Sequence, residues 1–327
     1  MTDAAIHRKT EASVASYLSL ARLDHATKHV FILPGVALAV ILRGVATQTL
    51  IGNLLLGFLS AVCIASANYV INEWLDREFD AHHPKKSKRS SVRNKLIPSL
   101  VYLEYFMFLS LGLALALFVN NTFFIVSGFF AVMGVIYNVE PLRSKDKAFL
   151  DVLSEAINNP IRLTLGWAMV DPTSLPPMSL LLGYWFGGAF LMNAKRMSEY
   201  RDLVRSVGKE TLVLYRRSFR YYTENRLITA CLMYAMFCGA FIGIFLIKYR
   251  AEYILFLLLL GLLFAVYFGL SLKPDSIAQE PERLFQSKVL VTVSAITGLA
   301  FLVLTVVDIP VISALSEQQF IELGSTT

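Results

Sequence analysis

Charged side chains are scarce in this sequence. Asp, Glu, Lys and Arg together make up 17% of its 327 residues, whereas soluble domains usually contain about 25%. Hydrophobic residues make up 56%, more than the roughly 45–50% of such domains. This balance excludes an ordinary soluble globular domain and favours a chain that lies in a lipid bilayer.

Cysteine is also rare, with three residues in the whole chain. Cys63, Cys231 and Cys238 all lie in apolar runs, at spacings that match no zinc motif. We therefore expect buried small hydrophobic side chains at these positions rather than a zinc site. The N-terminus has no charged segment followed at once by an apolar core, so we expect no cleavable signal peptide.

Long apolar runs, by contrast, recur along the whole chain. Nine of them approach the roughly 17–25 residues that cross a bilayer as a helix, some only with flanking polar residues. We therefore predict an all-α polytopic membrane protein with about nine transmembrane helices, folded as a single domain over residues 1–327. The runs cover residues 31–42, 50–71, 100–119, 122–137, 149–170, 178–192, 227–247, 253–272 and 289–307.

Basic residues gather in every second connection between these runs. The connection after the second run, residues 81–95, contains six of them, and the one after the sixth contains nine. The other connections are short and nearly neutral. By the positive-inside rule, residues 1–20 and the loops 81–95 and 197–226 lie in the cytoplasm, and the C-terminus lies outside. We expect an inner (plasma) membrane protein surrounded by membrane lipids, with no nucleic-acid partner because no soluble domain remains to bind one.

Acidic and amide side chains recur where the second run ends. Asn68, Asn72, Asp76 and Asp80 are spaced four residues apart, which places them in one slowly turning stripe on a helix. Carboxylate and amide oxygens suit Mg²⁺, and ionisable residues at membrane depth are usually functional. The stripe therefore predicts a metal site formed by Asn72, Asp76 and Asp80.

A second acidic face lies in the fifth run. Asp151 and Glu155 are one helical turn apart, and Asn158 continues their face. Arg162 follows Asp151 by three turns, and we expect Pro160 to kink the helix between them. A polar face inside an apolar segment has to turn towards protein or a water-filled cavity. Two such acidic helices facing one another would hold a diphosphate through bridging Mg²⁺.

Basic and aromatic side chains near the same membrane face complete the predicted site. Lys28 opens the first run, Tyr137 ends the fourth, and Lys195 and Arg196 follow the sixth. A positive surface there would attract a polyanionic substrate. The stretch GKETLVLYRRSFRYYTENR comes next, and we expect it to form a cytoplasmic helix.

Together these patterns resemble the UbiA superfamily of membrane prenyltransferases. The resemblance lies in the N-x-x-x-D-x-x-x-D stripe ending the second run and the acidic motif of the fifth, and it covers nearly the whole chain. Several stretches resemble more narrowly the branch typified by decaprenyl-phosphate phosphoribosyltransferase, although Glu73 stands where that branch commonly has Asp. They are KHVFILPGVAL, ANYVINEWLDREFDAHHPKKSKR, Asp151 with Arg162 and Gly166, and AKRMSEY.

The resemblance to this branch implies an Mg²⁺-dependent membrane transferase whose site faces the cytoplasm. The phosphate of a polyprenyl phosphate would attack phosphoribosyl pyrophosphate, and pyrophosphate would leave. Asp76, Asp80 and Asp151 would be the catalytic residues and, with Asn72, the metal ligands. The residues implied for substrate binding are Lys28, Asn68, Asn72, Tyr137, Glu155, Asn158, Arg162, Lys195 and Arg196.

Three other functions fit parts of the pattern. The first is a UbiA-type prenyltransferase that moves an isoprenyl chain from a prenyl diphosphate to an aromatic or lipid acceptor. The second is an ion-coupled transporter, which is disfavoured because the acids lie at helix ends and no inverted repeat is evident. The third is a cell-envelope scaffold with a degenerate site, which is disfavoured because both acidic motifs are intact. The length of the isoprenoid and the oligomeric state stay open.

Overall fold

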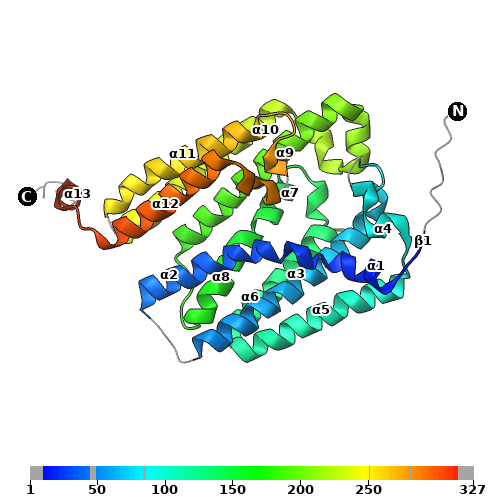
Figure 1. Cartoon of the computed structure of the whole chain (residues 1–327), viewed down its shortest axis with the longest axis horizontal. Coiled ribbons are helices and arrows are strands. Elements are labelled where there is room, and N and C mark those ends of the chain that lie inside the picture. The colour runs from blue at the N-terminus through cyan, green and yellow to red at the C-terminus, as the bar shows by residue number, and fades with distance from the viewer. Residues whose placement is uncertain (1–9, 45–48, 84–85, 250, 280, 316–327) are drawn as a thin grey trace, which may run out of the picture.

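The computed structural model describes residues 10–44, 49–83, 86–249, 251–279 and 281–315. Its helices form a bundle in which α9 packs along α10, α3 along α5, and α2 along α8 (Figure 1). The α-helices are α1 (Val14–Leu18), α2 (Leu33–Arg43), α3 (Leu50–Asp80), α4 (Ser90–Arg93), α5 (Pro98–Val119), α6 (Asn121–Asn138), α7 (Leu150–Ala156), α8 (Asn158–Val170), α9 (Met178–Tyr215), α10 (Glu224–Tyr249), α11 (Ile254–Ser271), α12 (Lys288–Val306) and α13 (Pro310–Leu315). The strands are β1 (Thr10–Glu11) and β2 (Asn94–Lys95), and the 3₁₀ helices are η1 (Ser19–Ala21), η2 (Leu23–Ile32), η3 (Lys86–Lys88), η4 (Ser144–Asp146), η5 (Arg217–Tyr221), η6 (Ala251–Tyr253), η7 (Ile277–Gln279) and η8 (Pro281–Gln286).

Six helices of the described chain are long and apolar enough to cross a membrane: α3, α5, α6, α10, α11 with the turn before it, and α12. The other predicted spans fall on shorter or more polar helices. The first lies in α2, which has 11 residues, and the fifth is divided into α7 and α8 at Ile157, three residues before Pro160. A mostly helical architecture with several candidate membrane spans is therefore confirmed, whereas length and hydropathy do not establish the count of nine.

Two glycines allow close crossings of the helices around the bundle centre. A Cβ atom at Gly166 of α8 would lie 2.1 Å from the carbonyl oxygen of Ile32. A Cβ atom at Gly134 of α6 would lie 1.9 Å from Oδ1 of Asn68 on α3. The contact at Gly166 is with backbone, so no side chain fits there, whereas at Gly134 the side chain of Asn68 occupies the place of a Cβ atom. As a result α8 packs closely on the chain at Ile32, and α6 packs closely on α3.

Apolar side chains cover much of the outside of the bundle. Phe118, Leu258 and Val306 each expose more than 70% of their surface. Exposed apolar area of this extent is a liability in water but matches the acyl chains of a bilayer. The interior therefore has to accommodate the polar residues that the membrane excludes.

The first and last described elements, β1 and α13, lie at opposite ends of the bundle (Figure 1). β1 pairs in parallel with β2, so the N-terminal segment is bound to the chain just before α5. The turns η4 and η5, which follow α6 and α9, pack against each other. Residues from the ends of α3, α6, α7 and α9 can therefore meet in one place.

Candidate active site

The acidic stripe of α3 ends the helix in contact with basic residues from two loops. Oδ1 of Asp76 accepts hydrogen bonds from Nη2 of Arg143 at 2.7 Å and pairs with Nζ of Lys145 at 2.6 Å. Asp80, which is buried, forms an ion pair with Arg89. Arg143 and Lys145 follow α6, and Arg89 follows η3. The loops after α3 and α6 therefore close over the end of this stripe.

One turn deeper along α3, the side-chain amides of Asn72 and Asn138 form a hydrogen-bonded relay. The side chain of Asn72 donates a hydrogen bond to Oδ1 of Asn138 at 2.5 Å. Lys145 donates to the same oxygen at 2.8 Å, so this lysine joins the relay to Asp76. Asn68 lies one turn further into the bundle and donates to the carbonyl of Phe130 at 3.2 Å. Asn68 thus contributes to the contact between α3 and α6.

Asp151 is completely buried at the start of α7. Its Oδ1 accepts a hydrogen bond from the hydroxyl of Tyr222. Its Oδ2 accepts from Ser218 at 3.1 Å and from Nε of Arg196 at 3.3 Å, and it lies 3.6 Å from Nη1 of Arg216. Both carboxylate oxygens therefore have protein donors, which offset the cost of burying the charge.

Arg196 is the centre of the second acidic group. Its guanidinium contacts Asp151, Glu155 at 2.7 Å and Glu199 at 3.2 Å, and it is 3% exposed. Glu155 also accepts a hydrogen bond from the hydroxyl of Tyr137 at 3.2 Å. One arginine thus fixes three carboxylates from α7 and α9, as its planar fork of donors permits.

Arg216 connects the two acidic groups. It lies beside Asp151, and its positive charge also acts on Asp76. The positive charges of Arg216 and Arg196 also act on the hydroxyl of Tyr137. One basic side chain therefore acts on carboxylates of both α3 and α7, and the diphosphate site expected between these helices stays a prediction.

A further cluster extends from the loop after α3 to Glu199. His83 lies 3.7 Å and Lys86 3.9 Å from Oε1 of Glu199, which also accepts a hydrogen bond from Tyr215. Burial lowers the pKa of Lys86 to about 7, although the charge of Glu199 acts in the opposite direction. Burial likewise lowers the pKa of Lys145 to about 8. Both lysines therefore hold their protons more weakly than a lysine exposed to water does.

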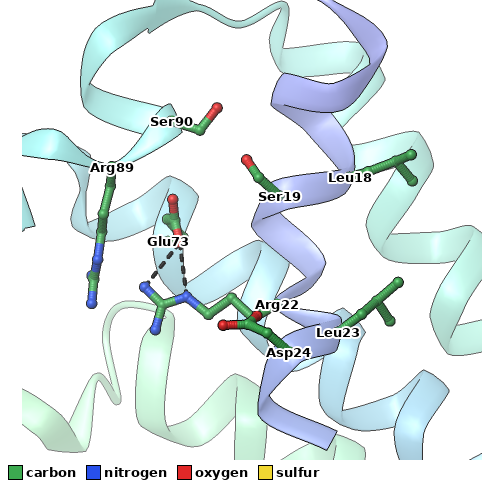
Figure 2. A pocket seen from close by; sticks show the side chains of 8 residues that line it. All are labelled: Leu18, Ser19, Arg22, Leu23, Asp24, Glu73, Arg89 and Ser90. Atoms are coloured by element: carbon green, nitrogen blue, oxygen red, sulfur yellow. Dashed lines mark hydrogen bonds and ion pairs between the residues drawn. The ribbon is translucent and has the colours of Figure 1, made fainter. Parts of the chain in front are cut away.

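Glu73 points away from the stripe. Figure 2 shows its carboxylate facing Arg22 of the N-terminal segment, whose Nε donates to Oε2 at 2.9 Å. Ser91 approaches the other oxygen at 3.4 Å. Glu73 and Arg22 border a groove of about 560 Å³, whose full lining is Leu18, Ser19, Arg22, Leu23, Asp24, Glu73, Arg89 and Ser90. Glu73 therefore anchors the N-terminal segment instead of joining Asp76 and Asp80.

The remaining predicted site residues have different positions. Lys195 is half-buried on α9, and Asn158 donates to the carbonyl of Glu155 at 3.0 Å. Arg162 is buried on α8 with its guanidinium near the ring of Phe130. The side chain of Lys28 lies outside the described part of the chain, so its predicted role stays a prediction.

Sequence reasoning did not assign Asn138, Ser218 and Tyr222 to the site. Asn138 directly follows the fourth apolar run, and this polar boundary was the only signal for it. Ser218 and Tyr222 lie in the stretch predicted to be a cytoplasmic helix, which is helical only in part. Helix α9 is broken at Gly208, where φ is 78° and ψ is 161°, and it ends at Tyr215. The turn η5 then brings Ser218 and Tyr222 to Asp151.

The donor set at the end of α3 suits Mg²⁺ in its chemistry. Asp76 and Asp80 supply carboxylate oxygens and Asn72 an amide oxygen, all of them hard ligands. In the ranges that the structure describes, no three His, Cys, Asp or Glu side chains are gathered as a metal cluster. Each carboxylate is instead neutralised by a basic side chain, which a divalent ion would displace.

The comparison with protein families agrees with this arrangement. The model of the UbiA prenyltransferase family matches residues 30–290, most of the chain. The protein belongs to the UbiA prenyltransferase family. The superfamily resemblance seen in the sequence is thereby confirmed, and the narrower phosphoribosyltransferase branch stays a prediction. No curated protein sequence matches this UbiA family member.

Solved UbiA structures share the fold. A UbiA homolog from Archaeoglobus fulgidus bound to DMAPP and Mg²⁺ has a TM-score of 0.65 at 18% identity, covering 89% of this chain and 100% of that chain. The homolog bound to GPP and Mg²⁺ has a TM-score of 0.57 at 18% identity, with the same coverage. A structure of digeranylgeranylglyceryl phosphate synthase has a TM-score of 0.59 at 17% identity, covering 89% and 98%. At these identities the similarity establishes the fold alone.

Proposed function

We propose that the protein is an Mg²⁺-dependent membrane transferase that releases pyrophosphate from a diphosphate donor. The observation that carries the proposal is that Asp76, Asp80 and Asp151 each form an ion pair with a basic residue. Two carboxylates one helical turn apart can share a cation, and the basic residues can take the phosphate oxygens. The relatives bound to DMAPP or GPP with Mg²⁺ support this reading.

Asp76 and Asp80 would hold the metal, with Asn72 and Asp151 as further predicted ligands. The bound ion supplies positive charge to the diphosphate and so makes it a better leaving group. Arg143, Lys145 and Arg89 now pair with the carboxylates of α3, and they would pair with phosphate oxygens once those carboxylates bind the ion. The chain thus exchanges internal ion pairs for contacts with the substrate, at a site arranged before the donor arrives.

The donor that we propose first is a prenyl diphosphate, and the reaction transfers its isoprenyl chain to an acceptor. Membership of the family supports this choice. The apolar exterior would let a long isoprenoid chain remain in the bilayer while its diphosphate enters the polar end. By the positive-inside rule, the basic loops around that end support a cytoplasmic position for it.

Phosphoribosyl transfer to a polyprenyl phosphate is the second candidate. One contact favours it: His83 and Lys86, from the HHPKK segment, both approach Glu199 of the AKRMSEY segment. These are the two segments on which the resemblance to that branch mainly depends, and here they form a single cluster. Its basic residues could bind the additional phosphate of phosphoribosyl pyrophosphate.

A two-donor assay tests the proposal and separates the candidates. We expect protein in lipid nanodiscs with Mg²⁺ to release pyrophosphate from labelled prenyl diphosphate when an aromatic or lipid acceptor is present. Labelled phosphoribosyl pyrophosphate with polyprenyl phosphate forms the second arm, and label entering the lipid phase there would favour the second candidate. Chelation of Mg²⁺ should abolish turnover in either arm. Binding of neither donor with Mg²⁺ would refute the proposed function.

pH is expected to affect diphosphate binding through Lys86. Its pKa of about 7 in the free protein means that the amine is mostly neutral above that pH. A bound diphosphate favours the ammonium form, so binding takes up a proton at higher pH, and affinity should fall by up to about tenfold per pH unit. Titration of inorganic pyrophosphate at saturating Mg²⁺ across this range measures the slope. Lys86→Met should lose that part of the slope, and an unchanged slope would contradict the assignment.

A further inference from the structure

One acidic residue outside the candidate site has no partner. Glu104 is the seventh residue of α5 and is 7% exposed, and both oxygens of its carboxyl group are fully buried without a hydrogen bond. Asp151 and Asp171 are also buried, but donors reach both oxygens of each. Among the residues that the structure describes, Glu104 alone is an acid with both oxygens buried and unpaired. An ionisable residue of this kind in a membrane helix is usually functional.

Glu104 lies on the part of α5 that packs against α3. Its neighbours on α5, Val101 and Tyr105, are buried in an apolar cluster with Trp74 of α3 and with η1 of the N-terminal segment. Trp74 comes two residues before Asp76, on another face of the same helix. The apolar cluster therefore holds α3 in place directly behind its acidic stripe.

No described side chain brings a positive charge to Glu104, and no charged group acts on it. The charged residue of α3 beside the cluster is Glu73, which is paired with Arg22. The remaining charged residues of α3, from Asp76 to Asp80, are paired with the basic loops or with each other. A lone carboxylate among apolar side chains is very costly, whereas the neutral acid costs much less. The protonated acid is therefore the form that fits this position.

The other titratable groups on α1, α3, α5 and α6 are phenols and one thiol, which carry no charge at neutral pH. None of them forms a hydrogen bond with Glu104. They are Tyr17, Cys63, Tyr69, Tyr102, Tyr105 and Tyr137. The proton on Glu104 therefore sets the charge of the contact between α3 and α5.

We propose that Glu104 is a proton-binding site whose ionisation loosens the contact of α5 with α3 and the N-terminal segment. The proton is held as the O–H of the neutral acid, and it leaves to hydroxide or buffer base as pH rises. The carboxylate that remains needs water, so the apolar cluster has to open. Because the cluster lies behind Asp76, its opening shifts the acidic stripe. The inference goes beyond the proposed function, since it concerns how the end of α3 is held and not which donor binds there.

Infrared difference spectroscopy of the full chain in nanodiscs tests for the proton. The C=O stretching band of a protonated carboxyl group is separate from the bands of carboxylates. We expect wild type at neutral pH to show such a band, which is missing from Glu104→Gln and fades in alkaline buffer. The matched control is Glu73→Gln, because Glu73 is similarly buried but pairs with Arg22 as a carboxylate, so its loss should leave the band unchanged. The proposal is overturned if Glu104→Gln keeps the full band.

Unfolding across the same pH range tests the consequence for stability. An unfolded chain exposes Glu104 to water, where glutamate is ionised at neutral pH, so the native state binds one proton more. Stability should therefore fall as pH rises, and the unfolding equilibrium constant should increase by up to about tenfold per pH unit until the native acid also ionises. Glu104→Gln should lack this part of the slope, and an unchanged slope would refute the proposal. Glu104→Leu, which suits the apolar cluster, gives the same comparison if the glutamine variant does not fold.

Backbone hydrogen exchange connects the proton to the candidate site. In alkaline buffer, residues 71–80 should exchange faster in wild type than in Glu104→Gln at the same pH, because only wild type acquires the buried charge. Equal rates would overturn the link between Glu104 and the acidic stripe. None of these measurements requires a substrate, so a failure of the proposed transferase activity would leave their results readable.

Discussion

Asp76→Asn is expected to lower turnover by roughly two orders of magnitude or more, as when one key electrostatic group is removed from an active site. The neutral amide cannot hold the cation, and it leaves Arg143 and Lys145 without the carboxylate that now pairs with both. The loss should appear as a lower kcat and a weaker dependence on Mg²⁺. Steady-state pyrophosphate release, measured across a range of Mg²⁺ concentrations, is the assay.

The control for this variant is Glu78→Gln. Glu78 lies two residues further along α3, its side chain is 80% exposed, and it pairs with its neighbour Arg77 at 3.2 Å. Loss of this surface pair should leave turnover and Mg²⁺ dependence close to wild type. If Asp76→Asn retained normal turnover at saturating donor, or if turnover persisted with Mg²⁺ chelated, the metal site at the end of α3 would be refuted.

Asp151→Asn is expected to destabilise the protein by roughly 3–5 kcal/mol, because it breaks a buried charge pair and leaves its partners uncompensated. Asp151 is 0% exposed, and it neutralises Arg196, which stays buried in the variant, and approaches Arg216, whose side chain is 15% exposed. The hydrogen bonds from Ser218 and Tyr222 would also be perturbed. Unfolding by heat or denaturant in nanodiscs measures the loss, and turnover should fall with it.

Glu224→Gln provides the comparison. Glu224 pairs with Arg201, but its side chain is 45% exposed, so the change should cost no more than about 1 kcal/mol. A Tm of Asp151→Asn equal to that of Glu224→Gln would show that the buried network does not depend on the charge of Asp151. That outcome would leave Asp151 available as a metal ligand but not as the residue that positions the two arginines.

Periodicity predicted the helical stripe on α3 well, because side-chain spacing on a helix follows directly from its geometry. Asn72, Asp76 and Asp80 do line the end of one helix. Spacing could not show what each would contact. The direction of Glu73, towards Arg22 instead of the stripe, depends on where the N-terminal segment packs, and that is a contact across 51 residues of chain.

The sequence by itself determined that the chain is a helical membrane protein with two acidic motifs, because apolar length, loop charge and helical spacing are local properties. The tertiary structure alone decided which basic residues neutralise which acids, since Arg143 and Lys145 come from the loop after α6, and Arg196 and Arg216 from α9 and its C-terminal end. It also decided that Tyr222 and Ser218 reach Asp151, because the break in α9 at Gly208 and the turn η5 return the chain over the site. Pairing of buried charges is a long-range property, set by helix packing rather than by neighbours in sequence.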